Sequence, residues 1–483
     1  MNHHADQFDI SFDTTLYTLV QALPQAERIA GFQVNLDLPI TGIATDSRKV
    51  QPGDLFIALR GERFDAHDFL PQVAALGAVA VVAERVPEEW TLPTLLVKDS
   101  LRALGHLGAF WRAQFNLPLI AVTGSNGKTT VKEMLAAILA AVYGEAGRCA
   151  TRGNFNNAIG LPLTLLRLQP EHQAAVIEMG MNHPGEIAYL ADLAKPTVAL
   201  VNNAQREHLE FMQNVEAVAQ ENGNVIASLP ENGVAVFPAD DEFTPLWYQL
   251  ARQAGARTLT FGLSDVADIS CEYRISEKGG ETGSDLRVAL RSSQSVRMQP
   301  LKLQVAGEHN VRNALAAIAC SMALGLDILT VARALEAFRP VGGRLQTKTV
   351  ANGAKIIDDT YNANPDSVRA AILVLAQAPT PRILVLGDMG EVGDQGAEFH
   401  VEAGHLARQQ GIETVLCLGP LSKHTQQAFG KGAQHFTQIV DLLEELEKIL
   451  HPRATILVKG SRFMRMERVV THFVPTWPLK EEH

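Results

Sequence analysis

The chain has 483 residues, 46% of them hydrophobic, and a formal net charge of -11 at pH 7. This length exceeds what one ordinary hydrophobic core needs, so we expect two to four domains, and the apolar content excludes a disordered chain. The acidic balance argues against a nucleic-acid-binding surface, which would be basic, and no run of residues reaches the ~18 apolar positions of a membrane span.

The cysteines and the amino terminus indicate a cytoplasmic protein. The cysteines lie far apart and form no Cys-x-x-Cys pair, so we interpret them as reduced thiols in the core: Cys149, Cys271, Cys320 and Cys417. The first residues lack a basic segment followed by an apolar one, so no signal peptide is expected. His3 and His4 could chelate a metal, but two histidines on a terminus are more often incidental.

Residues 1–115 have the pattern of a small α/β domain. Residues 53–61 indicate a strand between two turns, and residues 77–83 indicate a buried strand. Before them comes Asp-Ser-Arg, in which Arg48 beside Ser47 could grip a phosphate. Taken alone, such a tripeptide is more often a polar turn.

Residues 121–130, Ala-Val-Thr-Gly-Ser-Asn-Gly-Lys-Thr-Thr, carry the strongest functional signal. Residues 117–122 indicate a buried parallel strand, and residues 131–142 have the composition and apolar spacing of a helix. A glycine turn between a strand and a helix is the usual setting of a phosphate-binding loop, because glycines allow close approach and the helix start favours an anion. The alternative is a simple turn before a core helix.

The loop predicts a nucleotide site with a divalent cation. Lys128 can reach the outer phosphates, and the Thr129 hydroxyl can bind Mg²⁺. Val122 stands where the general pattern G-x-x-x-x-G-K-[ST] has its first glycine, so the loop is a shortened form. The loop residues that we expect to contact ATP are Gly124, Ser125, Asn126, Gly127, Lys128, Thr129 and Thr130.

Residues 116–340 alternate strands and helices, which predicts a doubly wound sheet. The predicted strands at residues 174–178 and 197–202 end near Glu178 and His208. Ligands of open α/β sheets bind beyond the carboxyl ends of the strands, and a carboxylate there can hold Mg²⁺. The alternative for each of these two side chains is that it caps the next helix.

Two asparagine-rich turns suit contacts with a peptide or a base edge, because an amide both donates and accepts hydrogen bonds. They are residues 152–157 and residues 307–313, the second of which opens a helical stretch. Both also suit ordinary loops. Residues 263–300 indicate strands and turns, with an exposed hairpin tip at residues 279–284.

Residues 341–483 indicate a third domain of Rossmann-like layout, entered through a glycine hinge at Gly342 and Gly343. Its predicted strands, each followed by polar or glycine residues, are residues 355–358, 382–386, 414–418 and 454–458. The domain lacks the G-x-G-x-x-G pattern, so we do not expect it to bind NAD.

Taken together, these motifs resemble those of the Mur ligases, which build the peptide of bacterial cell-wall precursors. The shared motifs cover nearly the whole chain: residues 46–48, 53–56, 123–130, 153–160, 178–182, 309–315, 358–365, 386–389 and 459–462. The shortened phosphate loop is the form that this family uses. Members that add diaminopimelate typically carry Asp-Asn-Pro-Arg in the last domain, whereas this chain has Tyr-Asn-Ala-Asn-Pro at residues 361–365.

The resemblance implies a ligase reaction that uses ATP and Mg²⁺. ATP would phosphorylate the terminal carboxylate of UDP-N-acetylmuramoyl-tripeptide, the amine of D-alanyl-D-alanine would attack the acyl phosphate, and phosphate would leave. Such chemistry demands charge neutralisation and positioning more than covalent catalysis. In this interpretation the first domain binds the UDP-sugar, the second binds ATP, and the third brings the dipeptide and closes on ATP. We expect a monomer.

The resemblance also implies roles for single residues. Lys128, Glu178, His208 and Arg344 would be catalytic, with Arg344 reaching the transferred phosphoryl group once the third domain closes. The remaining implied roles are Thr129, Glu178 and His208 for metal, Asn310 for adenine, Asp359 for ribose, Ser47 and Arg48 for uridine diphosphate, Asn156 and Asn157 for the peptide, and Asn362 and Asn364 for D-alanyl-D-alanine.

One position departs from the family pattern. Many Mur ligases carry a lysine, modified to a carbamate that supports a second metal, in the helix after the His-x-Glu segment. The matching residue here is Asn222, and no lysine lies between Lys195 and Lys278. An amide cannot be carbamylated, so we expect catalysis without this group, with a water on Asn222 as a further option for the metal.

Two other functions stay open on the sequence. A regulatory P-loop ATPase or switch would share the loop, although the Asn-Lys-x-Asp pattern of a GTPase is absent. Another ligase of the same fold, such as folylpolyglutamate synthase, is a nearer alternative. Phosphate release that depends on both a carboxylate and an amine substrate would distinguish a ligase from an ATPase.

Overall fold

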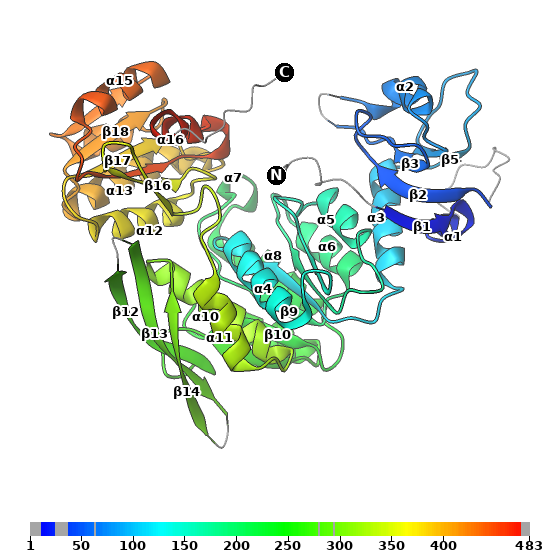
Figure 1. Ribbon diagram of the computed structural model, residues 1–483, viewed down its shortest axis with the longest axis horizontal. Helices are drawn as coiled ribbons and strands as arrows, with labels where there is room; N and C mark the ends of the chain where they lie inside the picture. Colours follow the sequence, from blue (N-terminus) through cyan, green and yellow to red (C-terminus); the bar gives the residue numbers. More distant parts are fainter. Residues whose placement is uncertain (1–10, 25–36, 62–63, 279–280, 293–294, 475–483) are drawn as a thin grey trace.

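The computed structural model describes residues 11–24, 37–61, 64–278, 281–292 and 295–474, so His3, His4 and the first two residues of the expected hairpin tip lie outside it. The chain forms three α/β domains, each built on its own sheet. The amino-terminal and carboxy-terminal domains lie at opposite ends and on the same side of the central domain (Figure 1). Across these described ranges, no helix is long and apolar enough to cross a membrane.

The amino-terminal domain is a five-stranded sheet in the order β1-β2-β3-β4-β5, with β1 antiparallel to β2 and the other pairs parallel. The predicted strands within residues 53–61 and 77–83 are confirmed as β3 and β4. The elements are β1 (Ser11–Thr15), α1 (Leu16–Gln21), β2 (Pro39–Ala44), β3 (Asp54–Ile57), η3 (Ala66–Phe69), α2 (Leu70–Ala75), β4 (Ala80–Ala83), β5 (Thr94–Leu96) and α3 (Ser100–Arg112).

The central domain is a nine-stranded sheet in the order β14-β13-β12-β11-β10-β9-β6-β8-β7. Strands β6 to β12 run parallel, and β13 and β14 add antiparallel strands at one edge. The strands are β6 (Leu119–Thr123), β7 (Arg148–Ala150), β8 (Ala174–Glu178), β9 (Val198–Val201), β10 (Val234–Pro238), β11 (Arg257–Phe261), β12 (Ile269–Lys278), β13 (Glu281–Arg291) and β14 (Val296–Leu303). The chain moves to one side after β6 and to the other after β9, which makes this the switch point where ligands of such sheets bind.

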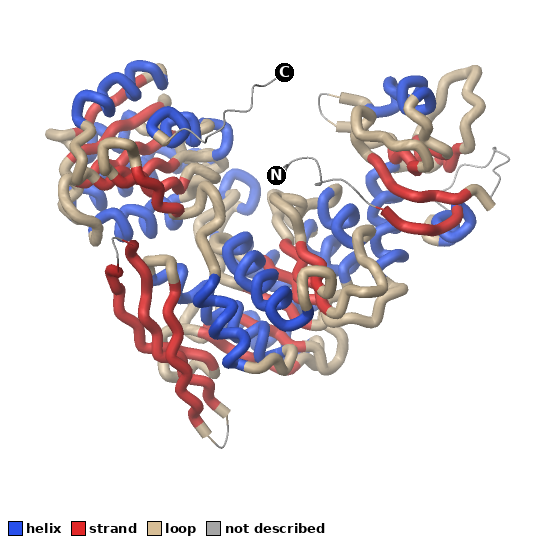
Figure 2. Tube along the Cα trace, viewed as in Figure 1, coloured by secondary structure: helices blue, strands red, loops and turns tan. Residues whose placement is uncertain are grey.

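Helices cover both faces of the central sheet, as expected for a doubly wound fold (Figure 2). Strand β6 is buried throughout, and its successive residues point to opposite faces. Leu119 and Ala121 face the core under α5, α6, α8 and α9, whereas Ile120 and Val122 face the core under α4, α10 and α11. The helices are α4 (Lys128–Tyr143), α5 (Gly160–Leu165), α6 (Glu186–Ala194), α7 (Leu209–Met212), α8 (Val215–Ala227), α9 (Thr244–Gln253), α10 (Glu308–Ala323) and α11 (Ile328–Ala337).

The carboxy-terminal domain is a six-stranded sheet in the order β15-β16-β20-β17-β18-β19, with β15 antiparallel. The four predicted strands are confirmed as β16, β17, β18 and β20, and the edge strands β15 and β19 were not predicted. The elements are β15 (Gln346–Thr349), β16 (Lys355–Asp359), α12 (Pro365–Ala376), β17 (Arg382–Gly387), η4 (Gly393–Gln395), α13 (Gly396–Gln409), β18 (Thr414–Leu418), α14 (Lys423–Phe429), β19 (Ala433–Phe436), α15 (Ile439–Ile449), β20 (Thr455–Lys459), η5 (Arg462–Met464) and α16 (Glu467–Phe473).

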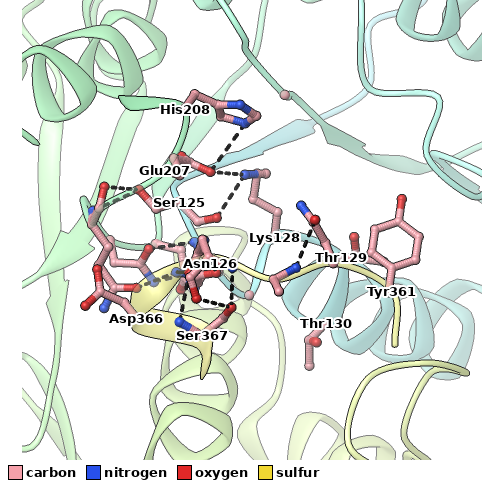
Figure 3. Close-up of a pocket in the computed structure, with 18 of the residues that line it drawn as sticks. Ser125, Asn126, Lys128, Thr129, Thr130, Glu207, His208, Tyr361, Asp366 and Ser367 are labelled. Carbon is pink, nitrogen blue, oxygen red and sulfur yellow. Dashed lines mark hydrogen bonds and ion pairs between the residues drawn. The ribbon is translucent and has the colours of Figure 1, made fainter. Parts of the chain in front are cut away.

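The helices hold this carboxy-terminal sheet between two cores. Helices α12, α13 and α14 pack on one face, and α15 and α16 pack on the other. The loop after β16 leads into α12, whose first turn lies beside the phosphate loop of the central domain (Figure 3). The fold therefore brings the carboxyl end of β16 to the switch point of the central sheet.

Candidate active site

A cavity of about 870 Å³ lies between the central and carboxy-terminal domains. Its size falls in the range of small-molecule and cofactor sites. The central domain contributes the phosphate loop, the ends of β8 and β9, and the first turns of α10; the carboxy-terminal domain contributes the loop from β16 into α12. The predicted ATP-binding residues that line this cavity are Ser125, Asn126, Gly127, Lys128, Thr129, Thr130, Asn310, Arg344 and Asp359.

The phosphate loop has the conformation that its glycines predict. Gly124 and Gly127 have φ values of 127° and 83°, which side-chain-bearing residues rarely adopt. A Cβ atom on Gly127 would lie 2.3 Å from Asn313 Oδ1. Asn202 and Asn203, just after β9, hold the loop: Asn202 Nδ2 donates to the carbonyl of Asn126 at 2.7 Å, and Asn203 Oδ1 accepts from the Asn126 amide at 2.8 Å. The loop is therefore fixed by the neighbouring strand.

Lys128 is the first residue of α4, and its ammonium group is held inside the site. Its Nζ donates to the carbonyl oxygens of Gly124 at 2.5 Å and Ser125 at 3.2 Å. It also pairs with Glu207 Oε2 at 3.3 Å (Figure 3). Glu207 is buried, and sequence reasoning did not assign it a role, although it directly precedes His208 beyond the end of β9.

Thr129 and Glu178 are brought together, as expected for a shared metal. Thr129 Oγ1 donates to Glu178 Oε1 at 3.2 Å, and Asn156 Nδ2 donates to the same oxygen at 2.9 Å. Glu178 is buried, and its second oxygen, Oε2, has no hydrogen-bond partner among the residues that the structure describes. A hydroxyl and a buried carboxylate oxygen form the hard donor set that Mg²⁺ prefers, so this pair fits a magnesium ion.

His208 lies in the same cavity but contacts carboxylates from both domains. Its Nδ1 lies 2.7 Å from Glu391 Oε2, and its Nε2 lies 3.8 Å from Glu207 Oε2. The close approach of the His208 side chain holds the pKa of Glu391 below its ordinary value. In the described parts of the chain, no group of three or more His, Cys, Asp and Glu side chains could hold a metal ion. The metal role of His208 therefore stays a prediction.

Arg344 already reaches the phosphate loop in this structure. Its Nη2 donates to Thr129 Oγ1 at 2.9 Å, and its guanidinium lies 4.2 Å from the centre of the Tyr361 ring. The backbone amide of Tyr361 donates to the carbonyl of Gly343 at 3.1 Å, which orders the expected hinge. The carboxy-terminal domain thus lies against the loop, with a cation beside the hydroxyl expected to bind metal.

The two residues expected at the nucleoside, Asn310 and Asp359, both line the cavity. Asn310 is buried, and its Nδ2 donates to the carbonyl of Ala306 at 2.8 Å. Asp359 Oδ2 pairs with Lys459 Nζ at 2.6 Å, so Lys459 is a further charged group that sequence reasoning placed in a motif but gave no role. His309, the residue before Asn310, also lines the cavity, and burial lowers its pKa to about 4.

The four asparagines expected to bind peptide all line the cavity. Asn157 Oδ1 accepts from the amides of Ile159 and Gly160, so it holds the start of α5. Asn364 caps α12 by accepting from the Ser367 amide at 2.8 Å. It also exchanges two hydrogen bonds with Asn126, at 2.9 and 3.3 Å. These contacts give Asn364 an interdomain role that was not predicted, and its contact with the dipeptide stays a prediction.

Ser47 and Arg48 do not line this cavity. They follow β2 in the amino-terminal domain, where Arg48 forms two side-chain hydrogen bonds with Asp46, at 2.9 and 2.8 Å. The side chain of Arg48 is 81% exposed, and its hydrogen bond holds the pKa of Asp46 below the ordinary value. The expected uridine diphosphate site therefore lies apart from the nucleotide cavity and stays a prediction.

Asn222 supports the phosphate loop from behind and does not line the cavity. It is buried on α8, and its Oδ1 accepts from Thr123 Oγ1 at 2.5 Å and from the Gly124 amide at 3.0 Å. Glu221, the residue before it, turns to the amide of Ile187. Because both hydrogen bonds of the Asn222 oxygen go to the loop, the option of a metal-bound water on Asn222 finds no support in this geometry.

Three family models match consecutive parts of the chain. "Mur ligase family, catalytic domain" matches residues 39–141, "Mur ligase middle domain" matches residues 122–321, and "Mur ligase, glutamate ligase domain" matches residues 343–462. The UDP-N-acetylmuramoyl-tripeptide–D-alanyl-D-alanine ligase of Escherichia coli (strain K12) is 40% identical over 445 residues, which cover 90% of this chain and 94% of that protein.

Solved structures are similar over nearly the same length. A crystal structure of MurF from Acinetobacter baumannii has 34% identity and a TM-score of 0.86, and covers 96% of this chain and 99% of that one. The MurF ligase from Thermotoga maritima in complex with ADP has 28% identity and a TM-score of 0.77, and covers 89% of this chain and 96% of that one.

Proposed function

The chain belongs to the Mur ligase family, and from this premise we propose that it adds D-alanyl-D-alanine to UDP-N-acetylmuramoyl-tripeptide in an ATP-dependent step of peptidoglycan precursor synthesis. Two relatives named UDP-N-acetylmuramoyl-tripeptide–D-alanyl-D-alanine ligase match over about nine-tenths of both chains. The observation that carries the proposal is the contact between Arg344 and Thr129, because it joins a cation of the third domain to the phosphate loop in one cavity.

The proposed chemistry starts from a carboxylate, which is a poor electrophile. One carboxylate oxygen of the tripeptide attacks the γ-phosphorus of ATP, and ADP leaves. The amine of D-alanyl-D-alanine then attacks the carbonyl carbon of the acyl phosphate, loses a proton, and expels inorganic phosphate that keeps the carboxylate oxygen. Most of the catalysis in such a reaction is positioning and stabilisation of negative charge.

The chain's own cations suit that requirement. Lys128 would turn from the loop carbonyls and Glu207 to the outer phosphates, while Arg344 would meet the transferred phosphoryl group. Thr129 and Glu178 would hold Mg²⁺, which when bound supplies positive charge beside the phosphates. Glu178 Oε2, buried without a hydrogen-bond partner in the described structure, supports this assignment.

The remaining substrate contacts are proposed from position. Asn310 would meet adenine and Asp359 the ribose, because both line the cavity around the loop. Ser47 and Arg48 would bind the uridine diphosphate in the first domain, and Asn156 would meet the peptide beside Glu178. Two asparagines are expected at the dipeptide. The amide nitrogen of Asn364 already donates to Asn126, whereas Asn362 is exposed, so Asn362 is the better placed to donate to a ligand.

We also propose that the enzyme works as a monomer in the cytoplasm. The central and carboxy-terminal domains of one chain together supply the lining of the cavity. All four cysteines are free and buried, which fits a reducing compartment.

Purified protein assayed for phosphate release tests the proposal. We expect release only when ATP, Mg²⁺, UDP-N-acetylmuramoyl-tripeptide and D-alanyl-D-alanine are all present, with single omissions as controls. Replacing the dipeptide by free D-alanine, or the tripeptide by a folate, separates this reaction from those of other ligases of the fold. Phosphate release without either acceptor would instead support an ATPase.

A further inference from the structure

We infer that Arg206 is a positioning residue that clamps helix α12 of the carboxy-terminal domain onto the phosphate loop. Arg206 follows β9 in the sequence Gln-Arg-Glu-His, between the loop contact of Gln205 and the Lys128 partner Glu207. Its guanidinium, however, points to the other domain. Sequence reasoning gave this residue no role.

The first half of the clamp is a bond to Asp366, in the first turn of α12. The Arg206 backbone amide donates to Asp366 Oδ2 at 2.9 Å, and its Nη2 donates to Asp366 Oδ1 at 2.7 Å. Its Nε lies 3.2 Å from both oxygens. Backbone and side chain of one residue therefore hold both oxygens of one carboxylate, which fixes distance and orientation together.

The second half of the clamp reaches α13. Arg206 Nη1 donates to Glu402 Oε2 at 2.7 Å and Nη2 to Glu402 Oε1 at 3.1 Å, while the guanidinium lies 5.2 Å from the centre of the Phe399 ring. The two carboxylates, Glu402 foremost, raise the pKa of Arg206. The side chains of Arg206 and Asp366 are only 26% and 20% exposed, so this network is better shielded from solvent than an ordinary surface pair.

The clamp acts where the catalytic contacts between the domains are made. Asn364, which caps α12, exchanges two hydrogen bonds with Asn126 of the phosphate loop. Arg344 of the same domain donates to Thr129, and the Tyr361 ring lies against the Arg344 guanidinium. Fixing the first turn of α12 therefore fixes the wall from which Arg344 approaches the phosphates, although Arg206 itself need not touch a substrate.

The inference makes a prediction about domain geometry that needs no activity. We expect Arg206→Ala to open the nucleotide-free protein, seen as a larger radius of gyration in X-ray scattering, and Arg206→Lys to open it less because one charge remains. Asp366→Asn tests the partner and leaves the cap residue Asn364 in place. Arg382→Ala is the matched control, because Arg382 pairs with Glu413 inside the carboxy-terminal domain; it should leave the scattering curve unchanged.

A second experiment measures kcat of the same variants, and it rests on the proposed function. Opening misplaces Arg344, so we expect kcat of Arg206→Ala to fall about tenfold to a hundredfold, with Arg206→Lys recovering part of it. Thermal unfolding of each variant reports whether its domains still fold. If Arg206→Ala folds and keeps the wild-type scattering curve, the clamp is overturned whatever its activity. If it opens but the wild type has no ligase activity, the proposed function fails and the clamp stands.

Discussion

The two walls of the cavity differ in how their parts are held. In the central wall, the phosphate loop is fixed by residues that follow the neighbouring strand, such as Asn202 and Asn203. In the carboxy-terminal wall, Arg344 and Asn364 meet the loop across a domain boundary. Asp366 of the same wall meets Arg206 of the central domain. The central wall is therefore preorganised by its own sheet. The carboxy-terminal wall is positioned only when its domain packs against the central domain.

The largest effect should come from the central wall, at Lys128. Lys128→Ala removes the ammonium expected at the outer phosphates, and loss of one transition-state donor costs on the order of 10²–10³ in rate. The fold should survive, because among the described residues the Lys128 ammonium bonds to two loop carbonyls and to Glu207. Steady-state kcat and thermal unfolding measure the two parts separately.

A matched control for that variant is Lys195→Ala. Lys195 belongs to the same domain but is exposed and pairs with Asp192, so its loss should leave kcat near the wild-type value. A folded Lys128→Ala protein with near-normal kcat would contradict the phosphate-loop assignment.

Within the carboxy-terminal wall, the largest effect on kcat should come from replacing Arg344. We expect Arg344→Ala to lower kcat about tenfold to a hundredfold, since a misplaced or missing group near the reacting atoms costs up to that much. Arg344→Lys should recover only part, because lysine cannot reproduce the planar stacking on Tyr361. Nucleotide affinity, measured by calorimetry with an ATP analogue, should change less than kcat; an affinity loss that accounts for the whole defect would assign Arg344 to ground-state binding.

Asn222 tests how the central wall is supported from behind. Asn222→Ala leaves the Thr123 hydroxyl and the Gly124 amide without their acceptor, which costs about 1–3 kcal/mol of unfolding free energy. Asn224→Ala on the same helix, whose amide donates to Glu221, should cost less. Denaturant unfolding compares the two, and equal losses would remove the special role of Asn222.

The same residue predicts indifference to bicarbonate. No amine is present at this position to be carbamylated, so activity should be the same with carbon dioxide removed and with bicarbonate added at constant pH. Activity that falls and recovers in this experiment would mean that a lysine elsewhere carries the carbamate.

A further effect concerns pH, at His309. Burial lowers the pKa of His309 to about 4 from 6.5, so the folded state favours the neutral imidazole. The unfolded chain binds the proton first, and the stability contribution is present above pH 6.5 and lost as pH falls toward 4. Between pH 6.5 and 5 we expect a loss of about 1.6 kcal/mol. His309→Gln should flatten this part of the stability profile, and an unchanged slope would exclude His309 as its source.

The same contrast explains what sequence reasoning could predict. The strand β6, the loop and α4 were predictable because their apolar pattern and glycines are local in sequence. The edge strands β15 and β19 were missed, since Gln346–Thr349 and Ala433–Phe436 are short, polar or half-exposed and lack a buried apolar run. Glu207 was within reach, because it sits beyond a strand end beside His208.

No local sequence pattern predicted the contacts that the carboxy-terminal wall makes with the central domain. Asn126 and Asn364 lie 238 residues apart, and Arg206 and Asp366 lie 160 apart. Their amide and charge complementarity is visible only once both domains are folded and placed. For Asn222, the match to the lysine position of other Mur ligases stays a prediction, and the sequence did not predict that the amide oxygen would bind the loop.

The central claim is that the two walls together activate a carboxylate by phosphorylation. The most direct test uses UDP-N-acetylmuramoyl-tripeptide whose terminal carboxylate carries ¹⁸O in both oxygens, with ATP, Mg²⁺ and D-alanyl-D-alanine. Mass spectrometry of the released phosphate should show one ¹⁸O atom per molecule, since the oxygen that attacks ATP leaves with the phosphate. Phosphate that carries no ¹⁸O while the pentapeptide product forms would contradict the acyl phosphate route.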